Sequence, residues 1–272
     1  MSLPARGENA NAPVICVDER GSEALICLQG IHKRFGEKVV LEGLSLDVFP
    51  GETLVILGGS GTGKSVCLRH IIGLTRPDAG SVLIDGEMIE DRSELDLVDV
   101  RRKIGFLFQS GALFDSMDVF ENIAFPLREA DWEADRIVAR VPEVLQLVDL
   151  DEAVAELMPS SLSGGMRKRV ALARAIAVRP RAILYDEPTT GLDPVTANTI
   201  NELIRSMQQR LEVTSVVVTH DIHSAFMVGD RIAFLHQGRI RFLGSVDEAR
   251  STTDPVLSAF LAGKALEDNH GA

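Results

Sequence analysis

The sequence has few cysteines and no long apolar run. Its 272 residues include three cysteines, with no Cys-x-x-Cys pair and no metal-ligand spacing to histidine; they are Cys16, Cys27 and Cys67. This pattern predicts neither a disulfide framework nor a zinc site, and it favours a reducing cytoplasm. Nowhere do about 18 uncharged apolar residues run together, as a membrane-spanning helix requires. If the protein works at a membrane, we expect another chain to span it.

Basic residues are also scarce. The 28 lysines and arginines stand against 40 aspartates and glutamates, which gives a formal net charge of -12. Such a charge repels phosphate backbones, so we expect no nucleic-acid partner. Internal repeats and low-complexity tracts are absent from the sequence, so each motif below occurs once.

The hydrophobic pattern predicts an α/β domain. Short apolar runs alternate with helical segments along the chain, as in a sheet of mostly parallel strands. The candidate strands are residues 25–31, 44–48, 54–57, 81–85, 104–108, 182–185, 215–219 and 231–235. We therefore predict one domain over residues 25–245. Residues 1–24 are rich in small and polar side chains and predict a flexible leader before it.

Helical periodicity replaces the strand pattern between Asp118 and Pro180. The candidate helices of this part are residues 119–127, 133–147 and 164–178. They predict a helical subdomain, about residues 110–180, that is inserted into the sheet domain.

A further helix is predicted at residues 246–266. Its apolar side chains fall on one stripe at helical spacing, namely Val256, Leu257, Phe260 and Leu261. We predict a C-terminal helical extension and tail over residues 246–272. The helix either closes the domain's own core or docks on a partner subunit.

A glycine-rich segment follows the apolar run 54–57 and precedes a predicted helix. It fits G-x-x-x-x-G-K-[ST] and consists of Gly58, Gly59, Ser60, Gly61, Thr62, Gly63, Lys64 and Ser65. Glycines let the backbone curl so that its N–H groups point at phosphate oxygens, and the helix adds its positive end. We expect Lys64 to bridge the β- and γ-phosphates of ATP and Ser65 to ligate Mg²⁺.

Two adjacent acids follow the apolar strand candidate 182–185. They are Asp186 and Glu187, at the carboxyl edge where open α/β sheets place their ligands. We expect Asp186 to hold Mg²⁺ and Glu187 to orient or deprotonate the attacking water. Either acid alone would suit a solvated loop or a helix N-cap, so the interpretation depends on the strand before them.

A third motif points to a family. Leu162, Ser163, Gly164, Gly165 and Met166 open a predicted helix and resemble the LSGGQ signature of ABC proteins, with Met166 in place of the usual glutamine. The Ser163 hydroxyl and the N–H groups of the two glycines form an anion-binding helix start. The resemblance implies a P-loop NTPase fold of the ABC ATPase type: a mostly parallel sheet core, an antiparallel β part and an inserted helical subdomain.

Other landmarks of ABC proteins occur in the expected order. Phe35 resembles the aromatic residue that stacks on adenine, although tyrosine is more usual there, and without the family it would be a core residue. Gln109 resembles the Q-loop glutamine that contacts Mg²⁺, and Asp193 resembles the D-loop aspartate that reaches across a dimer. His220 resembles the switch histidine that contacts the γ-phosphate, whereas alone it would be a structural histidine.

The resemblance also implies the stoichiometry. In ABC proteins the phosphate loop of one chain faces the signature of another, so a single copy of each implies a head-to-tail homodimer with two ATP sites. Ser163, Gly164 and Gly165 would then act in trans.

Two segments resemble the ATPases of Mla phospholipid-transport systems and their Mce-associated relatives. They are residues 110–129, after Gln109, and residues 166–169, which read Met-Arg-Lys-Arg. The resemblance implies a permease, a STAS-domain subunit and a periplasmic MCE-domain lipid-binding protein as partners, and a peripheral place on the cytoplasmic face of the bacterial inner membrane.

Parts of these segments admit two interpretations. The apolar Leu113, Phe114 and Met117 suit either a socket for a permease helix or core packing. The basic run Arg167, Lys168 and Arg169 suits either acidic partner residues or a solvated helix face.

The function predicted from the sequence is an ATP-hydrolysing subunit that moves phospholipids between the inner and outer membranes. The alternatives are the ATPase of a small-solute importer, a soluble ABC ATPase without a transport role, and an inactive scaffold. Intact Lys64, Asp186, Glu187 and His220 weigh against the scaffold.

Overall fold

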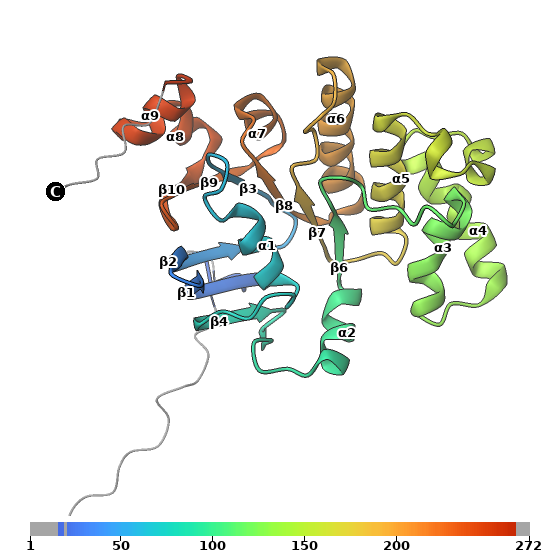
Figure 1. Ribbon diagram of the computed structural model, residues 1–272, viewed down its shortest axis with the longest axis horizontal. Helices are drawn as coiled ribbons and strands as arrows, with labels where there is room; N and C mark the ends of the chain where they lie inside the picture. Colours follow the sequence, from blue (N-terminus) through green and yellow to red (C-terminus); the bar gives the residue numbers. More distant parts are fainter. Residues whose placement is uncertain (1–15, 19–20, 265–272) are drawn as a thin grey trace, which may run out of the picture.

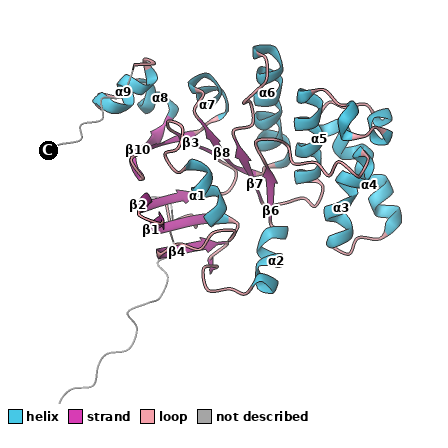
Figure 2. Cartoon of the chain, viewed as in Figure 1, coloured by secondary structure: helices cyan, strands magenta, loops and turns pink. Residues whose placement is uncertain are grey.

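The computed structural model describes residues 16–18 and 21–264 (Figure 1). A six-stranded sheet runs through the middle, a four-stranded sheet lies beside it, and helices α3, α4 and α5 pack together at one edge (Figures 1 and 2). In the described part of the chain, no helix has both the length and the apolar character that crossing a membrane requires.

The six-stranded sheet has the order β10-β9-β3-β8-β7-β6. Its strands are β3 (Thr53–Leu57), β6 (Ile104–Leu107), β7 (Ala182–Asp186), β8 (Thr214–Thr219), β9 (Arg231–His236) and β10 (Arg239–Ser245). Five strands pair in parallel, and only β10 pairs antiparallel, with β9. All residues of β3 and β8 are buried, which explains their apolar runs at residues 54–57 and 216–218. This parallel core confirms the predicted fold class.

The second sheet is antiparallel, with the order β2-β1-β4-β5. Its strands are β1 (Ile26–Phe35), β2 (Lys38–Val48), β4 (Ala79–Ile84) and β5 (Glu87–Met88). Helix α1 (Lys64–Ile71) lies between the two sheets (Figure 1). One hydrophobic core joins Leu28 of β1, Ile56 of β3 and Leu68 of α1. This core fixes the start of α1, where the phosphate loop ends.

Helices α6 (Pro194–Leu211) and α7 (Ile222–Val228) cover the other face of the central sheet. Val55 and Leu57 of β3 pack in one core with Ile204 of α6, whereas Leu54 and Ile56 pack on the α1 side. The central strands are thus buried on both faces. Helix α2 (Glu94–Arg102) precedes β6.

Helices α3 (Val119–Glu129), α4 (Ala134–Leu147) and α5 (Gly164–Ile176) pack together beside β6 (Figure 1). Two short 3-10 turns, Glu152–Glu156 and Pro159–Ser161, connect α4 to α5. These helices begin and end within two residues of the predicted ones.

The predicted continuous helix at residues 246–266 is wrong. The chain forms α8 (Val246–Arg250) and α9 (Pro255–Leu261), because Asp254 caps α9 and proline takes its first turn. Leu257 is buried, and the rest of the predicted stripe packs against the same core. The stripe therefore closes the chain's own core. The predicted tail beyond residue 264 lies outside the described residues, as do residues 1–15 of the predicted leader.

The cysteines also differ from the expectation. Cys16 and Cys27 form a disulfide, although no disulfide was predicted. The physical reason is a turn: Val17 forms an antiparallel bridge with Glu23, which returns residue 16 to the side of β1. Cys67 is fully buried, and burial raises its pKa to about 12, so it packs as a small hydrophobic residue.

Candidate functional site

The phosphate loop joins β3 to α1 and depends on three glycines. Gly61 and Gly63 have φ of 75° and 105°, which residues with a side chain rarely adopt. At Gly58 a Cβ atom would lie 2.5 Å from the carbonyl oxygen of Leu235 in the neighbouring strand β9. Gly63 is the N-cap of α1 and has no side chain to cap it. The first N–H groups of α1 are therefore available to an anion.

Lys64 lies in the first turn of α1 and is almost fully buried. Its ammonium donates to the carbonyl oxygens of Gly58 and Gly59, each at 2.9 Å. It also lies 3.4 Å from Oε1 of Glu187. The charge is thus fixed between the phosphate loop and the end of β7.

Asp186 ends β7 and accepts a hydrogen bond from the Ser65 hydroxyl at 2.8 Å. Burial raises the pKa of Asp186, and Glu187 next to it acts in the same direction, while the Ser65 hydroxyl opposes the shift. Two oxygen donors of the kind that Mg²⁺ prefers therefore lie side by side at the end of the loop.

Glu187 is at the centre of the cluster and is 9% exposed. Its Oε2 accepts from Thr190 Oγ1 at 3.2 Å and lies 2.8 Å from Nδ1 of His220, which follows β8. Because a carboxylate only accepts hydrogen bonds, the imidazole donates through Nδ1. Its other ring nitrogen, Nε2, is left for a second partner. Half of the His220 side chain, 51%, is exposed. The carboxylate is thereby oriented from three sides, by Lys64, Thr190 and His220.

Two predicted residues lie apart from this cluster. Phe35 ends β1 and is half-exposed, with the Lys33 ammonium 5.5 Å from its ring centroid, so it is not a core residue. Gln109 follows β6 and is exposed. Within residues 16–18 and 21–264, no hydrogen bond joins the Gln109 side chain to Ser65 or Asp186.

The signature residues lie beside α6. Ser163 is the N-cap of α5 and accepts from the Met166 N–H at 3.2 Å. A Cβ atom on Gly165 would lie 2.5 Å from Cγ2 of Thr196. Asp193 caps α6 and accepts from the Thr196 hydroxyl, which lowers the pKa of this carboxyl.

The signature and the phosphate loop are not brought together within the described chain. Helix α5 packs beside β6, whereas the loop follows β3, and strands β8 and β7 lie between them (Figure 1). The loop cluster can hold a polyphosphate and orient a water molecule against it. The signature offers a second anion-binding surface elsewhere.

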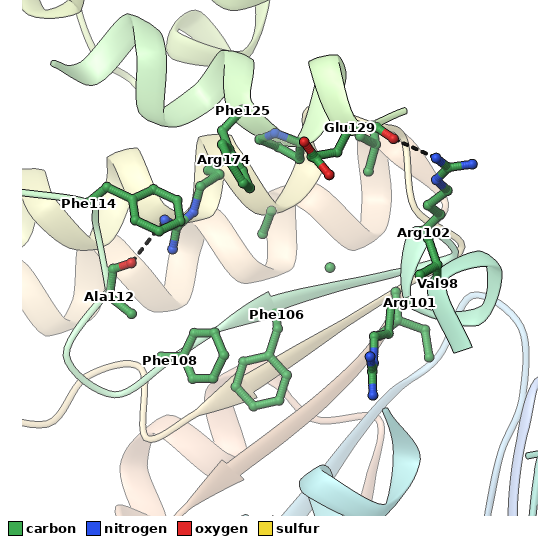
Figure 3. Close-up of a pocket in the computed structure, with 15 residues that line it drawn as sticks. Val98, Arg101, Arg102, Phe106, Phe108, Ala112, Phe114, Phe125, Glu129 and Arg174 are labelled. Carbon is green, nitrogen blue, oxygen red and sulfur yellow. Dashed lines mark hydrogen bonds between the residues drawn. The ribbon is translucent and has the colours of Figure 1, made fainter. Parts of the chain in front are cut away.

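An aromatic cleft of about 650 Å³ lies between β6 and helices α2, α3 and α5 (Figure 3). The aromatic cleft is lined by Phe106, Phe108, Phe114 and Phe125. Arg101, Arg102, Arg174 and Glu129 also line it. Of the predicted socket residues, Phe114 faces the cleft, but Leu113 packs against the core and Met117 is not among the lining residues. For Leu113 the structure favours core packing, and the permease socket stays a prediction.

Sequence reasoning missed two residues of this region. Thr190 donates a hydrogen bond to the Glu187 carboxylate. Its position three residues after Glu187 was the signal in the sequence that could have predicted this contact. Lys168 is buried behind Gln109 and Glu187, although the basic run suggested a solvated helix face or a partner contact.

Comparison with known proteins gives consistent matches. The chain matches the family model described as ABC transporter over residues 41–190. It is 40% identical over 248 residues to the intermembrane phospholipid transport system ATP-binding protein MlaF of Escherichia coli (strain K12), a match that covers 91% of this chain and 92% of that protein. It is 41% identical over 242 residues to the probable ribonucleotide transport ATP-binding protein mkl of Mycobacterium leprae, with 88% of this chain and 69% of that protein covered.

A solved structure agrees with these matches. It is the dimeric structure of a post-hydrolysis state of the ATP-binding cassette MJ0796 bound to ADP and Pi. The TM-score is 0.75 at 35% identity, and the match covers 81% of this chain and 98% of that one.

Proposed function

We propose that two copies of this chain drive phospholipid transport between the inner and outer membranes. The premise is that the chain belongs to the ABC transporter family and is an ATP-binding subunit that hydrolyses ATP. The observation that carries the catalytic part is the contact chain from Lys64 through Glu187 to His220. It joins the phosphate loop to a fixed carboxylate and a half-exposed imidazole.

Within this chain each residue has a distinct task. The Lys64 ammonium meets the β- and γ-phosphates, and the loop N–H groups add further donors. Glu187 accepts a proton from the attacking water, while His220 and Thr190 hold its carboxylate in place. The Nε2 face of His220 is directed to the γ-phosphate. Phe35 stacks on the adenine from the end of β1.

Mg²⁺ is the proposed metal. Ser65 and Asp186 would hold it, with Gln109 reaching it when the Q-loop closes, and the metal would neutralise charge on the phosphates. The 2.8 Å contact between Ser65 and Asp186 supports this pair. Mg²⁺ commonly takes one or two protein oxygens and completes its shell with water and phosphate.

The active assembly is a head-to-tail homodimer. In one chain the signature lies beside α6 and away from the phosphate loop, with Ser163 and Gly164 exposed. We therefore assign Ser163, Gly164 and Gly165 to the ATP that a second copy binds. Asp193 lies in the loop before α6, where it can reach the same interface. The dimeric state of the MJ0796 cassette supports this arrangement.

A permease is the proposed membrane partner, with the aromatic cleft as its docking site. The aromatic lining suits the apolar face of a short amphipathic helix. We assign residues 25–245 to the ATPase domain, with its helical subdomain at about 110–180, and residues 246–272 to the extension and tail.

The phospholipid cargo rests on the likeness to MlaF, which extends over nearly the whole of both chains. STAS-domain and MCE-domain partners, and a place on the cytoplasmic face of the inner membrane, belong to the same proposal. Transport of a smaller solute is the second candidate, because mkl is named a probable ribonucleotide transport protein. Purification of the native complex separates the two: an MCE-domain subunit supports phospholipids, and a soluble solute-binding protein contradicts them.

The Glu187→Gln substitution tests the catalytic proposal. Glutamine keeps the size of the side chain but cannot take a proton, so we expect the variant to bind ATP and to lose at least about 100-fold in kcat. It should also accumulate as a dimer when ATP and Mg²⁺ are present, as light scattering after size exclusion would detect. Hydrolysis at the wild-type rate would remove Glu187 from this role.

A further inference from the structure

Lys168 lies on α5 in the basic run Arg167, Lys168 and Arg169, and it is 5% exposed. Its ammonium donates to the carbonyl oxygen of Gln109. It also donates to the carbonyl oxygen of Glu187 at 3.4 Å. One cation of the helical subdomain thus contacts two backbone segments, one after β6 and one after β7.

A buried ammonium is costly unless it is hydrogen-bonded and paired with charge. Burial lowers the pKa of Lys168, while the carboxylates of Asp186 and Glu187 act in the opposite direction. The rest of the buried face of α5 is largely apolar, as in Val170, Leu172 and Ile176. If position 168 only had to fill space in the core, an apolar side chain would be enough. We therefore attribute the buried charge to the hydrogen bonds with the two carbonyl groups.

The contact with Glu187 occurs where the backbone is unusual. Glu187 has a φ of 49°, in the left-handed region that residues with a side chain rarely adopt. Its N–H donates to Val218 O at 2.9 Å, and its carbonyl accepts from the Thr190 N–H at 3.2 Å. Lys168 adds a contact from the helical subdomain to the same peptide.

A second cation of α5 holds the other end of the segment after Gln109. The Arg174 guanidinium donates to Gly111 O at 3.0 Å and to Ala112 O at 2.9 Å. It also lies 5.6 Å from the ring centroid of Phe114 in the aromatic cleft (Figure 3). Residues 168 and 174 are about 9 Å apart along the helix at 1.5 Å per residue. One rigid helix therefore contacts both the cleft and the peptide of Glu187.

We propose that Lys168 is a positioning residue that connects the aromatic cleft to the hydrolytic centre. Its ammonium holds the peptides of Gln109 and Glu187 against α5, so a shift of α5 or of residues 109–114 on occupation of the cleft moves the Glu187 carboxylate. The coupling runs through direct contacts between neighbouring elements. It rests on the proposed function, because it takes Glu187 as the residue that handles water.

The kinetic test uses the purified full-length chain with ATP and Mg²⁺. Lys168→Met keeps most of the volume and removes the charge, and we expect it to lower kcat at least about tenfold while KM for ATP changes less than about threefold. Lys168→Arg, which keeps a cationic donor, should recover part of the loss. Arg169→Met is the matched control, because that guanidinium donates to Asp149 O instead; its kcat should stay within about twofold of wild type.

Amide hydrogen exchange supplies a readout that does not depend on turnover. Lys168→Met should speed exchange at residues 109–114 about tenfold, and Arg169→Met should leave it unchanged. Wild-type exchange and wild-type kcat in Lys168→Met would overturn the inference. If Glu187→Gln loses activity in the same assay while Lys168→Met keeps it, only this inference fails; if Glu187→Gln stays active, the proposed catalytic site fails.

Discussion

The residues of the phosphate loop and the acids after β7 are specified by short-range rules. The glycines of the loop, Lys64 and the pair Asp186 and Glu187 follow buried strands directly, so the sequence alone places them at one sheet edge. The contacts that orient these side chains depend instead on residues far away along the chain. Burial of Lys168 depends on α5 packing against loops about 20 and 60 positions away along the chain, and a basic run carries no signal of it.

Gly165 gives a prediction at the scale of one residue. A Cβ atom there would lie 2.5 Å from Cγ2 of Thr196, so Gly165→Ala should lower the free energy of unfolding by about 1–3 kcal/mol despite the better helix propensity of alanine. Urea denaturation measures this, and ATPase activity should fall with it, because the start of α5 is displaced.

Thr196→Ser is the matched background for that test. It removes Cγ2 but retains the hydroxyl that donates to Asp193. In this background Gly165→Ala should be neutral or stabilising by up to about 1 kcal/mol. An equal loss in both backgrounds would show that the steric argument is incorrect.

At the scale of elements, the central strands were predictable because both of their faces are buried. Residues 104–108, 182–185, 215–219 and 231–235 agree with β6 to β9 within one or two positions. Strand β10 was missed because it alternates between exposed and half-buried positions and carries two arginines, Arg239 and Arg241. Helix α6 was also missed, although Asp193 before Pro194 is a typical helix start.

Arg140 explains how the end of α5 is stabilised. This buried residue of α4 donates through Nε to Ala177 O at 3.0 Å and through Nη2 to Ile176 O at 3.1 Å. It therefore satisfies two terminal carbonyl groups of α5 with a cation, which the helix dipole favours. The three helices depend on this contact as well as on their apolar core.

Arg140→Met should therefore lower the free energy of unfolding by about 2–3 kcal/mol, since the charged hydrogen bonds are lost while the apolar stem is kept. Glu143→Gln is the control, because it removes only the exposed partner of the same arginine and should cost less than about 1 kcal/mol. Chemical denaturation of both variants checks the prediction. Equal losses would assign the effect to the ion pair instead.

At the scale of the whole molecule, the phosphate loop and the signature residues lie on two separated surfaces. The sequence predicted the dimer only through its resemblance to a family, since no periodicity or composition encodes a partner. The described chain adds a physical reason: β8 and β7 separate the strand of the phosphate loop from the edge where α5 packs. In the proposed head-to-tail dimer, each copy therefore supplies half of two composite sites.

Mixing two inactive variants tests this claim most directly. Lys64→Met disables the phosphate loop and Ser163→Arg blocks the signature, so each homodimer should be inactive. In a mixed dimer, one site combines an intact loop with an intact signature. The account predicts that the mixture hydrolyses ATP well above the sum of its two components, measured as phosphate release. A mixture that stays at that sum, while each variant remains folded, would contradict it.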